Sequence, residues 1–252
     1  MNEAEFHTIL TWLVIGAAPL VVLGLVFISA PYGRHERKGW GLTVPSRVGW
    51  IMMEAPCVLV FVGTYALGDF RGATVPLILL GVWQVHYVHR TFIFPFRARV
   101  KGKSMPVAVA LMAITFNSIN AYINARWISH LGSYGDAVLS EPHLWIGIGV
   151  FFMGLVINIS SDSILFRLRK PGETGYKIPR GGMYRWLTSP NYFGELLEWL
   201  GWAIACWSLP GLAFFLFTAA NLVPRAVTNH RWYHDKFDDY PRERKIIVPL
   251  VV

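Results

Sequence analysis

Residues 157–199 read INISSDSILFRLRKPGETGYKIPRGGMYRWLTSPNYFGELLEW. This stretch starts inside one apolar run and ends inside another, with a cationic, glycine-rich segment between them. Arginine provides forked donors and glycine lets backbone N–H groups approach closely, so the segment suits a ligand with several phosphates. A solvated loop on the positive side of a membrane would carry the same charges without any ligand. The cations are Arg167, Arg169, Lys170, Lys177, Arg180 and Arg185.

The residues that flank this segment favour the ligand. Asn158 and Asp162 are four positions apart and share one helical face. Asn191, Glu195 and Glu198 do the same at the start of the following apolar run. Carboxylates and amides inside a membrane are costly, and they usually mark a functional site.

The composition indicates a helical membrane protein. Of the 252 residues, 54% are hydrophobic and 15% are charged, whereas a soluble domain carries about a quarter charged residues. Membrane topology explains the net charge of +8 better than nucleic acid does. Cys57 and Cys206 lie inside apolar runs, so neither a disulfide nor a metal site is expected. Glu3 and Glu5 precede the first run, without the basic start of a signal peptide.

Seven apolar runs of about 20 residues are each long enough to cross the hydrocarbon core. We therefore expect a single domain, residues 1–252, that forms an all-α integral membrane protein with seven transmembrane helices. Residues 208–211 are expected to make a tight hairpin, with Pro210 and Gly211 as helix breakers. The runs are 9–30, 48–67, 73–94, 106–128, 143–166, 191–208 and 210–232.

Basic residues alternate with the side of the membrane. Most of the Lys and Arg residues lie in the segments 31–47, 95–104, 167–190 and 225–252, and the other connections are mainly acidic. The positive-inside rule then places the N-terminus outside or in the lumen, and the C-terminus in the cytosol. This alternation fails if one span is removed, which supports seven.

Polar side chains from five spans are expected at one depth. With a rise of about 1.5 Å per residue, Glu54 and Tyr87 lie about 10 Å below the cytosolic ends of their spans. Asn158 and Asp162 lie about 6–12 Å below the same surface. The outer half shows almost no polar residues, so we expect a polar cavity that opens to the cytosol. A lone Asn or Tyr could simply make an interhelical hydrogen bond. The other polar residues expected at this depth are Glu195, Glu198, Arg225, Asn229 and His230.

Several short motifs follow one another in a fixed order. They are HYVHRTF (86–92), INISSD (157–162), LRKPGE (168–173), IPRGG (178–182) and NYFGE (191–195). Together they resemble the steroid 5α-reductase family (3-oxo-5α-steroid 4-dehydrogenases), and the resemblance covers essentially the whole chain. The element around Asn191 and Glu195 is also similar to membrane methyltransferases and sterol reductases, so Glu54 and the other motifs are more specific.

The resemblance implies a seven-helix reductase that uses NADPH to saturate the 4,5 double bond of a 3-oxo-4-ene steroid. It implies that Glu54 and Tyr87 are catalytic and bind the 3-oxo group. Trp50, Met53, Phe116 and Trp199 are the expected substrate contacts. The implied cofactor contacts are Tyr32, Arg34, His35, His86, Arg90, Lys101, Lys103, Asn158, Asp162, Arg169, Lys177, Asn191, Glu195, Arg225, Asn229 and Tyr233.

This chain departs from the family pattern at Met53, Phe94, Asn229 and the loop 100–103, which affects the steroid preference and the nucleotide affinity rather than the reaction. His86 and His89 lack a third ligand at a suitable spacing, so no metal is expected. We expect the basic loops 31–38, 97–103 and 167–185 to hold the pyrophosphate and the 2′-phosphate and to order when the nucleotide binds. The protein is expected to be a monomer in a bacterial inner membrane or an endoplasmic reticulum, and to bind no nucleic acid.

Three other classes remain open. A related reductase of an enoyl thioester or another sterol double bond would share the nucleotide site and differ near Glu54 and Trp199. A membrane methyltransferase is disfavoured because S-adenosylmethionine has no phosphate for the basic loops to bind. The third class is a non-enzymatic transporter or lipid-binding protein. Transporters usually show internal repeats and broken helices, and neither is visible in this sequence.

Overall fold

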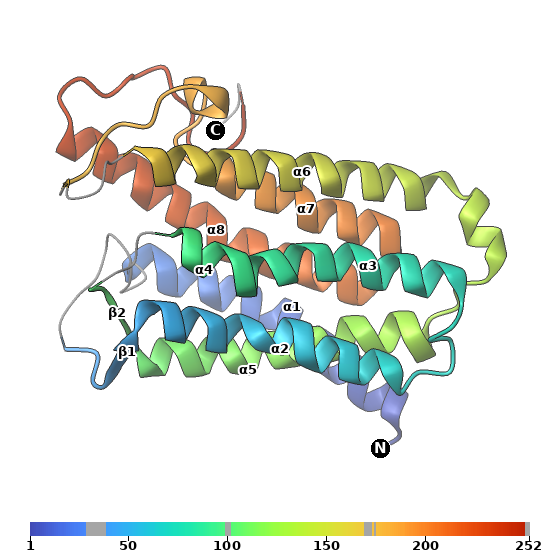
Figure 1. Cartoon of the computed structure of the whole chain (residues 1–252). Coiled ribbons are helices and arrows are strands. Elements are labelled where there is room, and N and C mark those ends of the chain that lie inside the picture. Colours follow the sequence, from blue (N-terminus) through green and yellow to red (C-terminus); the bar gives the residue numbers. More distant parts are fainter. Residues whose placement is uncertain (29–38, 99–101, 169–172, 174, 250–252) are drawn as a thin grey trace.

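The computed structural model describes residues 1–28, 39–98, 102–168, 173 and 175–249. Long helices run side by side and nearly antiparallel, joined by short connections at the two ends of the bundle (Figure 1). The long helices are α1 (Glu3–Phe27), α2 (Ser46–Ala66), α3 (Thr74–Val88), α5 (Val107–Arg126), α6 (Pro142–Arg167), α7 (Pro190–Cys206) and α8 (Leu209–Lys236).

These seven helices coincide with the seven apolar runs of the sequence. Five of them are long and apolar enough to cross a membrane, namely α1, α2, α5 with its extension, α6 and α8. The other two are shorter, but α3 continues through the π-helix η2 (His89–Ile93) into α4 (Phe94–Arg97). The described chain is therefore a helical, multi-pass membrane protein.

The two ends of the bundle differ in charge. The end that carries the C-terminus of α6 and the start of α7 holds described cations such as Arg97, Lys103, Arg180 and Arg185. The opposite end holds Glu3, Asp69 and Glu141 among others. The alternation of charge expected along the sequence therefore places these basic and acidic residues at opposite ends of the bundle.

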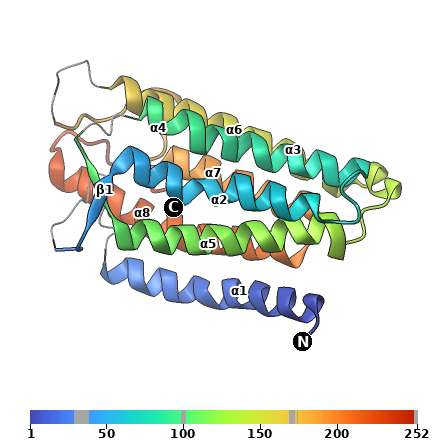
Figure 2. The same ribbon diagram turned by 60° about the horizontal axis from the view of Figure 1, so that its bottom comes forward.

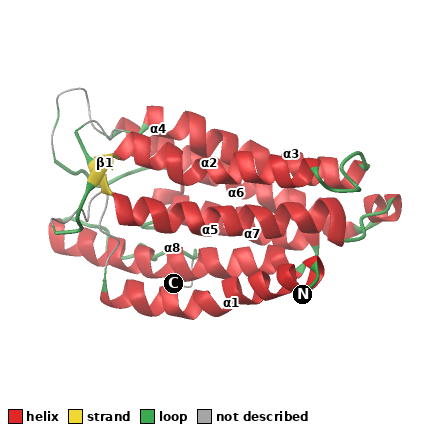
Figure 3. Cartoon of the chain, turned by 90° about the horizontal axis from the view of Figure 1, so that it is seen from below, coloured by secondary structure: helices red, strands yellow, loops and turns green. Residues whose placement is uncertain are grey.

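A short antiparallel ribbon, which the sequence did not indicate, ties two helices together at the cationic end. In it β1 (Thr43–Pro45) pairs with β2 (Ser104–Pro106), and the two strands lead directly into α2 and α5 (Figure 3). Pro45 and Pro106 are the N-cap residues of these helices. The start of α2, and with it the height of Glu54, is thus set by a backbone pairing.

Helices α6 and α7 approach each other more closely than any apolar pattern suggested. A Cβ atom added at Gly154 would lie 2.5 Å from the backbone N of Glu198, and one at Gly194 would lie 2.5 Å from the backbone N of Asn158. Cβ atoms added at Gly147 and Gly201, two helical turns closer to the acidic end, would approach the backbone of the facing helix equally closely. Small residues at such an interface let two helix backbones touch. The polar ends of α6 and α7 are consequently held together.

We expect Gly154→Ala to destabilise the protein by about 1–3 kcal/mol, because the added methyl group overpacks a backbone contact. Gly149→Ala is the matched control on the same helix, since a Cβ there has no atom within 4 Å. Thermal unfolding in detergent measures both variants. The close-packing interpretation is wrong if the two variants melt together.

A cluster of large aromatic side chains fills the middle of the bundle. Trp83 packs against Phe61 at 4.4 Å and against Trp202 at 5.0 Å between ring centroids. Trp199 packs against Phe214 at 4.2 Å. These rings come from α2, α3, α7 and α8, and they are at most 3% exposed. These rings form a buried apolar cluster on the outer side of the polar residues.

The expectation of an almost apolar outer half is wrong. Helix α5 carries a buried row of amides: Asn117 donates to the carbonyl of Met53 at 2.6 Å, and Asn124 donates to Asn120 at 3.0 Å. The indole of Trp202 donates to Asn124 at 2.8 Å. Spacings of three and four residues put all three amides on one face, where they bond to one another and to the neighbouring helices. Asn120 Nδ2 is buried without a hydrogen-bond partner among the described residues.

Helix α1 lies at the edge of the bundle, along α5 and α8 (Figure 2). It begins with a capping box in which the Asn2 side chain accepts from the backbone N–H of Glu5. At the acidic end it is fixed by Arg126, whose guanidinium lies 2.6 Å from Glu3, and by His7, which bonds the carbonyl of Ile123 at 2.8 Å.

The turn between α7 and α8 differs from the expected one. Trp207 adopts a left-handed conformation with φ 44°, and Ser208 caps α8 by accepting from the backbone N–H of Gly211. Pro210 and Gly211 therefore belong to the first turn of α8 and do not form the loop. Proline suits this position because the first N–H groups of a helix have no internal partner.

The C-terminal tail packs on the connection that leads into α7. The backbone N–H groups of Thr188 and Ser189 donate to the carbonyls of Lys245 and Ile246 at 2.8 and 3.1 Å. Arg244 is 5% exposed and donates to the carbonyl of Pro179 at 2.9 Å. The connection also contains η5 (Gly182–Arg185). The tail thus contacts this connection at Pro179, Thr188 and Ser189. Ordering of the basic loops by the nucleotide stays a prediction.

Candidate active site

An ion-pair cluster lies between η2, α6 and α7. One guanidinium nitrogen of Arg90 is 3.6 Å from Asp162 Oδ2, and the other is 3.6 Å from Glu195 Oε2. The three side chains are 14%, 6% and 15% exposed. Arg90 therefore partners two largely buried carboxylates, and the charge of Arg97 also acts on Asp162.

Two asparagines complete this cluster. Asn191 donates to Asp162 Oδ1 at 3.0 Å, and Asn158 donates to the backbone carbonyl of Asn191 at 3.0 Å. The close packing of α6 on α7 brings them together. Asn158, Asp162 and Glu195, three of the residues expected at one depth, thus lie in one cluster with Asn191.

The π-helix η2 orients Arg90. A π turn widens the helix locally, and such turns are frequent at functional sites. Trp50 donates from its indole N–H to the carbonyl of Arg90 at 3.1 Å, and the guanidinium lies 4.8 Å from the Trp50 ring and 4.4 Å from the Phe94 ring. The two rings also contact each other, with centroids 4.8 Å apart. Contact with both rings restrains the guanidinium, so Arg90 is presented to the two carboxylates in a defined direction.

A second buried pair lies one turn further into the membrane. His86 Nδ1 is 2.6 Å from Glu198 Oε2, and both residues are nearly inaccessible, at 3% and 0% exposure. The other carboxyl oxygen, Glu198 Oε1, has no partner among the described residues. His86, expected to contact the cofactor, therefore contacts Glu198 and the ring of Trp199, whose centroid is 4.7 Å away.

Tyr87 and Glu54 lie in the same interior. The Tyr87 ring packs between Trp83 at 4.9 Å and Trp199 at 5.4 Å, and the residue is 4% exposed. Glu54 is partly buried on α2, within electrostatic range of Tyr87, Arg90 and Glu195. Both residues thus lie near the cluster of carboxylates.

The expected substrate contacts fall into different groups. Trp50 and Trp199 border the cluster around Arg90 and Tyr87. Met53 packs with Met105 and Ala110 in a cluster that Trp50 also contacts. Phe116 stacks on Phe217 with centroids 3.8 Å apart.

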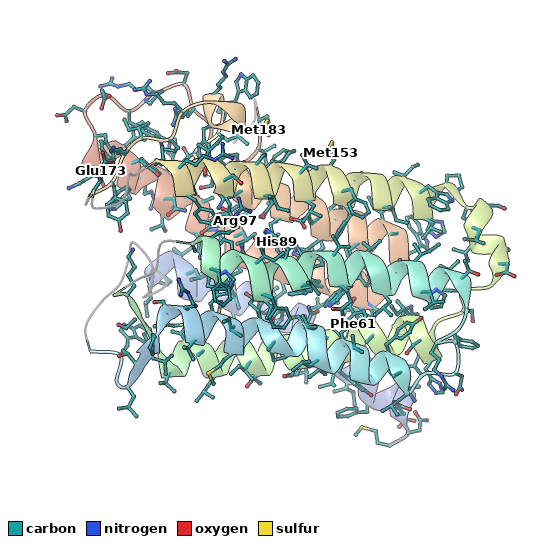
Figure 4. All side chains as sticks on the ribbon, viewed as in Figure 1. Phe61, His89, Arg97, Met153, Glu173 and Met183 are labelled. Carbon is teal, nitrogen blue, oxygen red and sulfur yellow. The ribbon has the colours of Figure 1, made fainter. Side chains whose placement is uncertain are left out.

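The described cations and aromatic residues expected to bind the cofactor are spread over the cationic end. Lys103 lies 6.0 Å from the ring of Tyr176, and Lys177 pairs with Glu173 at 2.6 Å (Figure 4). Arg225 donates to Asn221 at 3.1 Å. Tyr233 stacks on Tyr240 at 5.1 Å, and Asn229 lies one helical turn before it on α8.

The remaining predicted cofactor residues fall outside the described part of the chain. They are Tyr32, Arg34, His35, Lys101 and Arg169.

Sequence reasoning missed two features that shape the site. The partner of His86 was not predicted, because no periodicity links α3 to α7. The tail contact at Arg244 was also missed, although an arginine within a short polar segment after the last span was visible. Figure 4 shows His89 and Arg97 between the α3–α4 rod and α6, and Arg97 donates to Ser163 Oγ at 2.7 Å.

Membrane-length helices around an interior of carboxylates, amides and a phenol define a multi-pass membrane protein with a buried polar site. The family model described as 3-oxo-5-alpha-steroid 4-dehydrogenase matches residues 103–252. Similar curated proteins extend the match to nearly the whole chain. Steroid 5-alpha-reductase DET2 of Arabidopsis thaliana is 43% identical over 260 residues, covering 99% of this chain and 98% of the relative.

Mammalian relatives are equally similar. The 3-oxo-5-alpha-steroid 4-dehydrogenase 1 of Homo sapiens is 46% identical over 225 residues, covering 88% of this chain and 86% of the relative. The Bos taurus protein of the same name is 42% identical over 242 residues, covering 94% and 93%. The chain belongs to the steroid 5α-reductase family and is an oxidoreductase.

Proposed function

We propose that this protein reduces the 4,5 double bond of a 3-oxo-4-ene steroid with NADPH. The observation that carries the proposal is the meeting of Tyr87 and Glu54 with the Arg90 cluster inside the bundle. A phenol and a carboxyl group can donate to a ketone, and the neighbouring amides and carboxylates suit a polar cofactor. Trp50, Phe116, Trp199 and Met53 are the proposed apolar walls.

In this proposal Tyr87 and Glu54 polarise the 3-oxo group. Negative charge develops on the ketone oxygen as the C5 position is reduced, so a donor aimed at that oxygen stabilises the transition state more than the ground state. The Tyr87 hydroxyl donates one hydrogen bond. Glu54, in its carboxylic acid form, donates a second. As C5 accepts hydride, the electron pair of the 4,5 double bond forms a 3,4 double bond and the carbonyl pair moves onto the oxygen, which gives an enolate. The ketone re-forms when C4 takes a proton from water.

The residues around Arg90 fit the proposed nicotinamide end of the cofactor. Asp162 and Glu195 provide acceptors for ribose hydroxyl and carboxamide N–H groups, and Asn158 and Asn191 hold α6 and α7 at the spacing that this requires. Bound NADPH would supply the hydride. Described cations that suit its phosphates are Lys103, Lys177 and Arg225, with Asn229, Tyr233 and His86 as further proposed contacts.

A preference for NADPH over NADH is expected from the cationic end of the bundle. One charge-assisted hydrogen bond to the 2′-phosphate contributes about 1.5 kcal/mol, so kcat/KM should favour NADPH by at least about tenfold. The double variant Lys103→Gln/Lys177→Gln is expected to reduce this ratio, whereas Arg242→Gln, an exposed cation of the tail, is the control. Equal use of both nucleotides by the unmodified protein would contradict the preference.

We also propose that all seven long helices cross the membrane, with the cationic end in the cytosol and the N-terminus outside or in the lumen. The separation of charge between the two ends supports this orientation. Cysteine labelling from either side of sealed vesicles, at Glu141 and Arg185, tests it. A monomer in a bacterial inner membrane or endoplasmic reticulum is the proposed setting.

The function itself is tested by incubating the purified protein with NADPH and a 3-oxo-4-ene steroid. We expect the nicotinamide absorbance to fall together with formation of the 5α-reduced ketone, identified by mass spectrometry. Reduction of an enoyl thioester without any reduction of the steroid would instead assign the site to the related class of membrane reductases.

A further inference from the structure

A groove on the outward face of α6 lies apart from the proposed active site. Its volume is about 550 Å³, and it is open to the outside of the bundle. Most of its lining is apolar and comes from Leu155, Val156, Ile159 and Ile164. Val156 is 66% exposed. Because α6 is apolar and long enough to span a membrane, this face meets lipid acyl chains.

The polar atoms of the groove gather at its cationic end. Ser160, Ser163 and Arg167 complete the lining there, and no carboxylate contributes to it. A second guanidinium reaches the same end, because Arg97 donates to Ser163 Oγ at 2.7 Å. The segment that contains η5 lies alongside, since a Cβ at Gly182 would be 3.0 Å from the Ile164 side chain. The groove is therefore apolar toward the membrane centre and cationic toward its surface.

The length of the groove matches one lipid leaflet. Residues 155–167 rise about 18 Å along α6, and half of the hydrocarbon core is about 15 Å thick. An acyl chain that follows the apolar part would bring its glycerol and phosphate to the level of the two hydroxyls and Arg167. A dinucleotide fits less well because it has nothing apolar to place against the lower part.

We infer that this groove binds one anionic glycerophospholipid, with an acyl chain along Val156 and Ile159 and the phosphate beside Arg167. The cations favour an anionic headgroup because a cationic residue near the membrane surface attracts such lipids. This groove takes part in no step of the proposed reaction, although Arg97 and Arg167 belong to the loops expected to hold the nucleotide phosphates.

The test is native mass spectrometry of the whole protein in detergent, titrated with phosphatidylglycerol or phosphatidylcholine of the same acyl chains. We expect a single phosphatidylglycerol adduct that saturates at a concentration at least about fivefold below that for phosphatidylcholine, the factor for one cation. Val156→Trp, which fills the groove, and Arg167→Gln, which removes its cation, should each weaken the adduct by a similar factor.

Matched controls separate this groove from general lipid contact. Met153→Trp places the same ring on a neighbouring exposed face of α6 that does not line the groove (Figure 4). Arg231→Gln removes an exposed cation of α8. Both should leave phosphatidylglycerol binding unchanged. The inference is overturned if both lipids bind alike, if Val156→Trp behaves like Met153→Trp, or if saturating NADPH displaces the lipid, which would assign the cations to the nucleotide.

Discussion

Tyr87→Phe is expected to lower kcat on a 3-oxo-4-ene steroid by about 10²–10³-fold, the loss seen when one donor to a developing oxyanion is removed. The ring should stay in place, because it packs against Trp83 and Trp199 and phenylalanine keeps the same contacts. KM should change little, since the missing hydrogen bond strengthens mainly in the transition state. Single-turnover kinetics with excess enzyme separates this chemical step from product release.

The Glu54 series tests the second donor. Glu54→Gln retains a donor and should keep part of the activity, whereas Glu54→Ala loses it and should approach the Tyr87→Phe variant. Tyr65→Phe is the matched control, because Tyr65 is equally buried but its hydroxyl bonds the carbonyl of Arg71 at the acidic end. Unchanged turnover in Tyr87→Phe would remove Tyr87 from the role of polariser.

The helices were predictable because burial in lipid leaves a strong signal. An apolar run must be as long as the membrane is thick, and each run of this sequence coincides with one long helix. Contacts between segments that are far apart in the sequence leave little signal in that sequence. The pairing of β1 with β2 involves three residues on each strand. The C-terminal tail bonds to Thr188 and Pro179 mostly through backbone atoms, which are present in every sequence.

Other features were present in the sequence but were not recognised. Gly147 and Gly154, and Gly194 and Gly201, are seven positions apart in both helices, a spacing that repeats one helical face and marks a close contact. Asn117, Asn120 and Asn124 also share a face, and they contradict an apolar outer half. Both patterns concern small or uncharged residues, which the emphasis on carboxylates and cations overlooked.

The site was predicted in part for a physical reason. Charged residues inside an apolar helix are costly, so Asp162, Glu195 and Arg90 were visible as candidates from their positions alone. Which carboxylate takes which partner depends on rotation about each helix axis, and the π turn at residues 89–93 changes that rotation for Arg90. The sequence showed no sign of this turn. The pairing of His86 with Glu198 could not be anticipated because no periodicity links α3 to α7.

Arg90→Met is expected to destabilise the protein by about 3–5 kcal/mol, because it leaves two largely buried carboxylates without their cation. For a chain of this size the melting temperature should fall by about 6–20 °C. Arg180→Met is the matched control. Arg180 pairs with Asp239 at 3.5 Å, but the two side chains are 68% and 72% exposed, and an exposed pair contributes at most about 1 kcal/mol.

A rescue variant separates the loss of charge balance from the loss of packing against Trp50 and Phe94. In the triple variant Arg90→Met/Asp162→Asn/Glu195→Gln no buried charge remains unpaired, and the amide introduced at position 162 still offers an oxygen to Asn191. If the uncompensated carboxylates cause the instability, the triple variant should melt well above Arg90→Met despite carrying two more substitutions. If it melts at or below Arg90→Met, the cation acts mainly through its stacking on the two rings. The melting curves therefore show whether this cluster holds the helices together through charge, which a cofactor or substrate entering beside Arg90 would perturb.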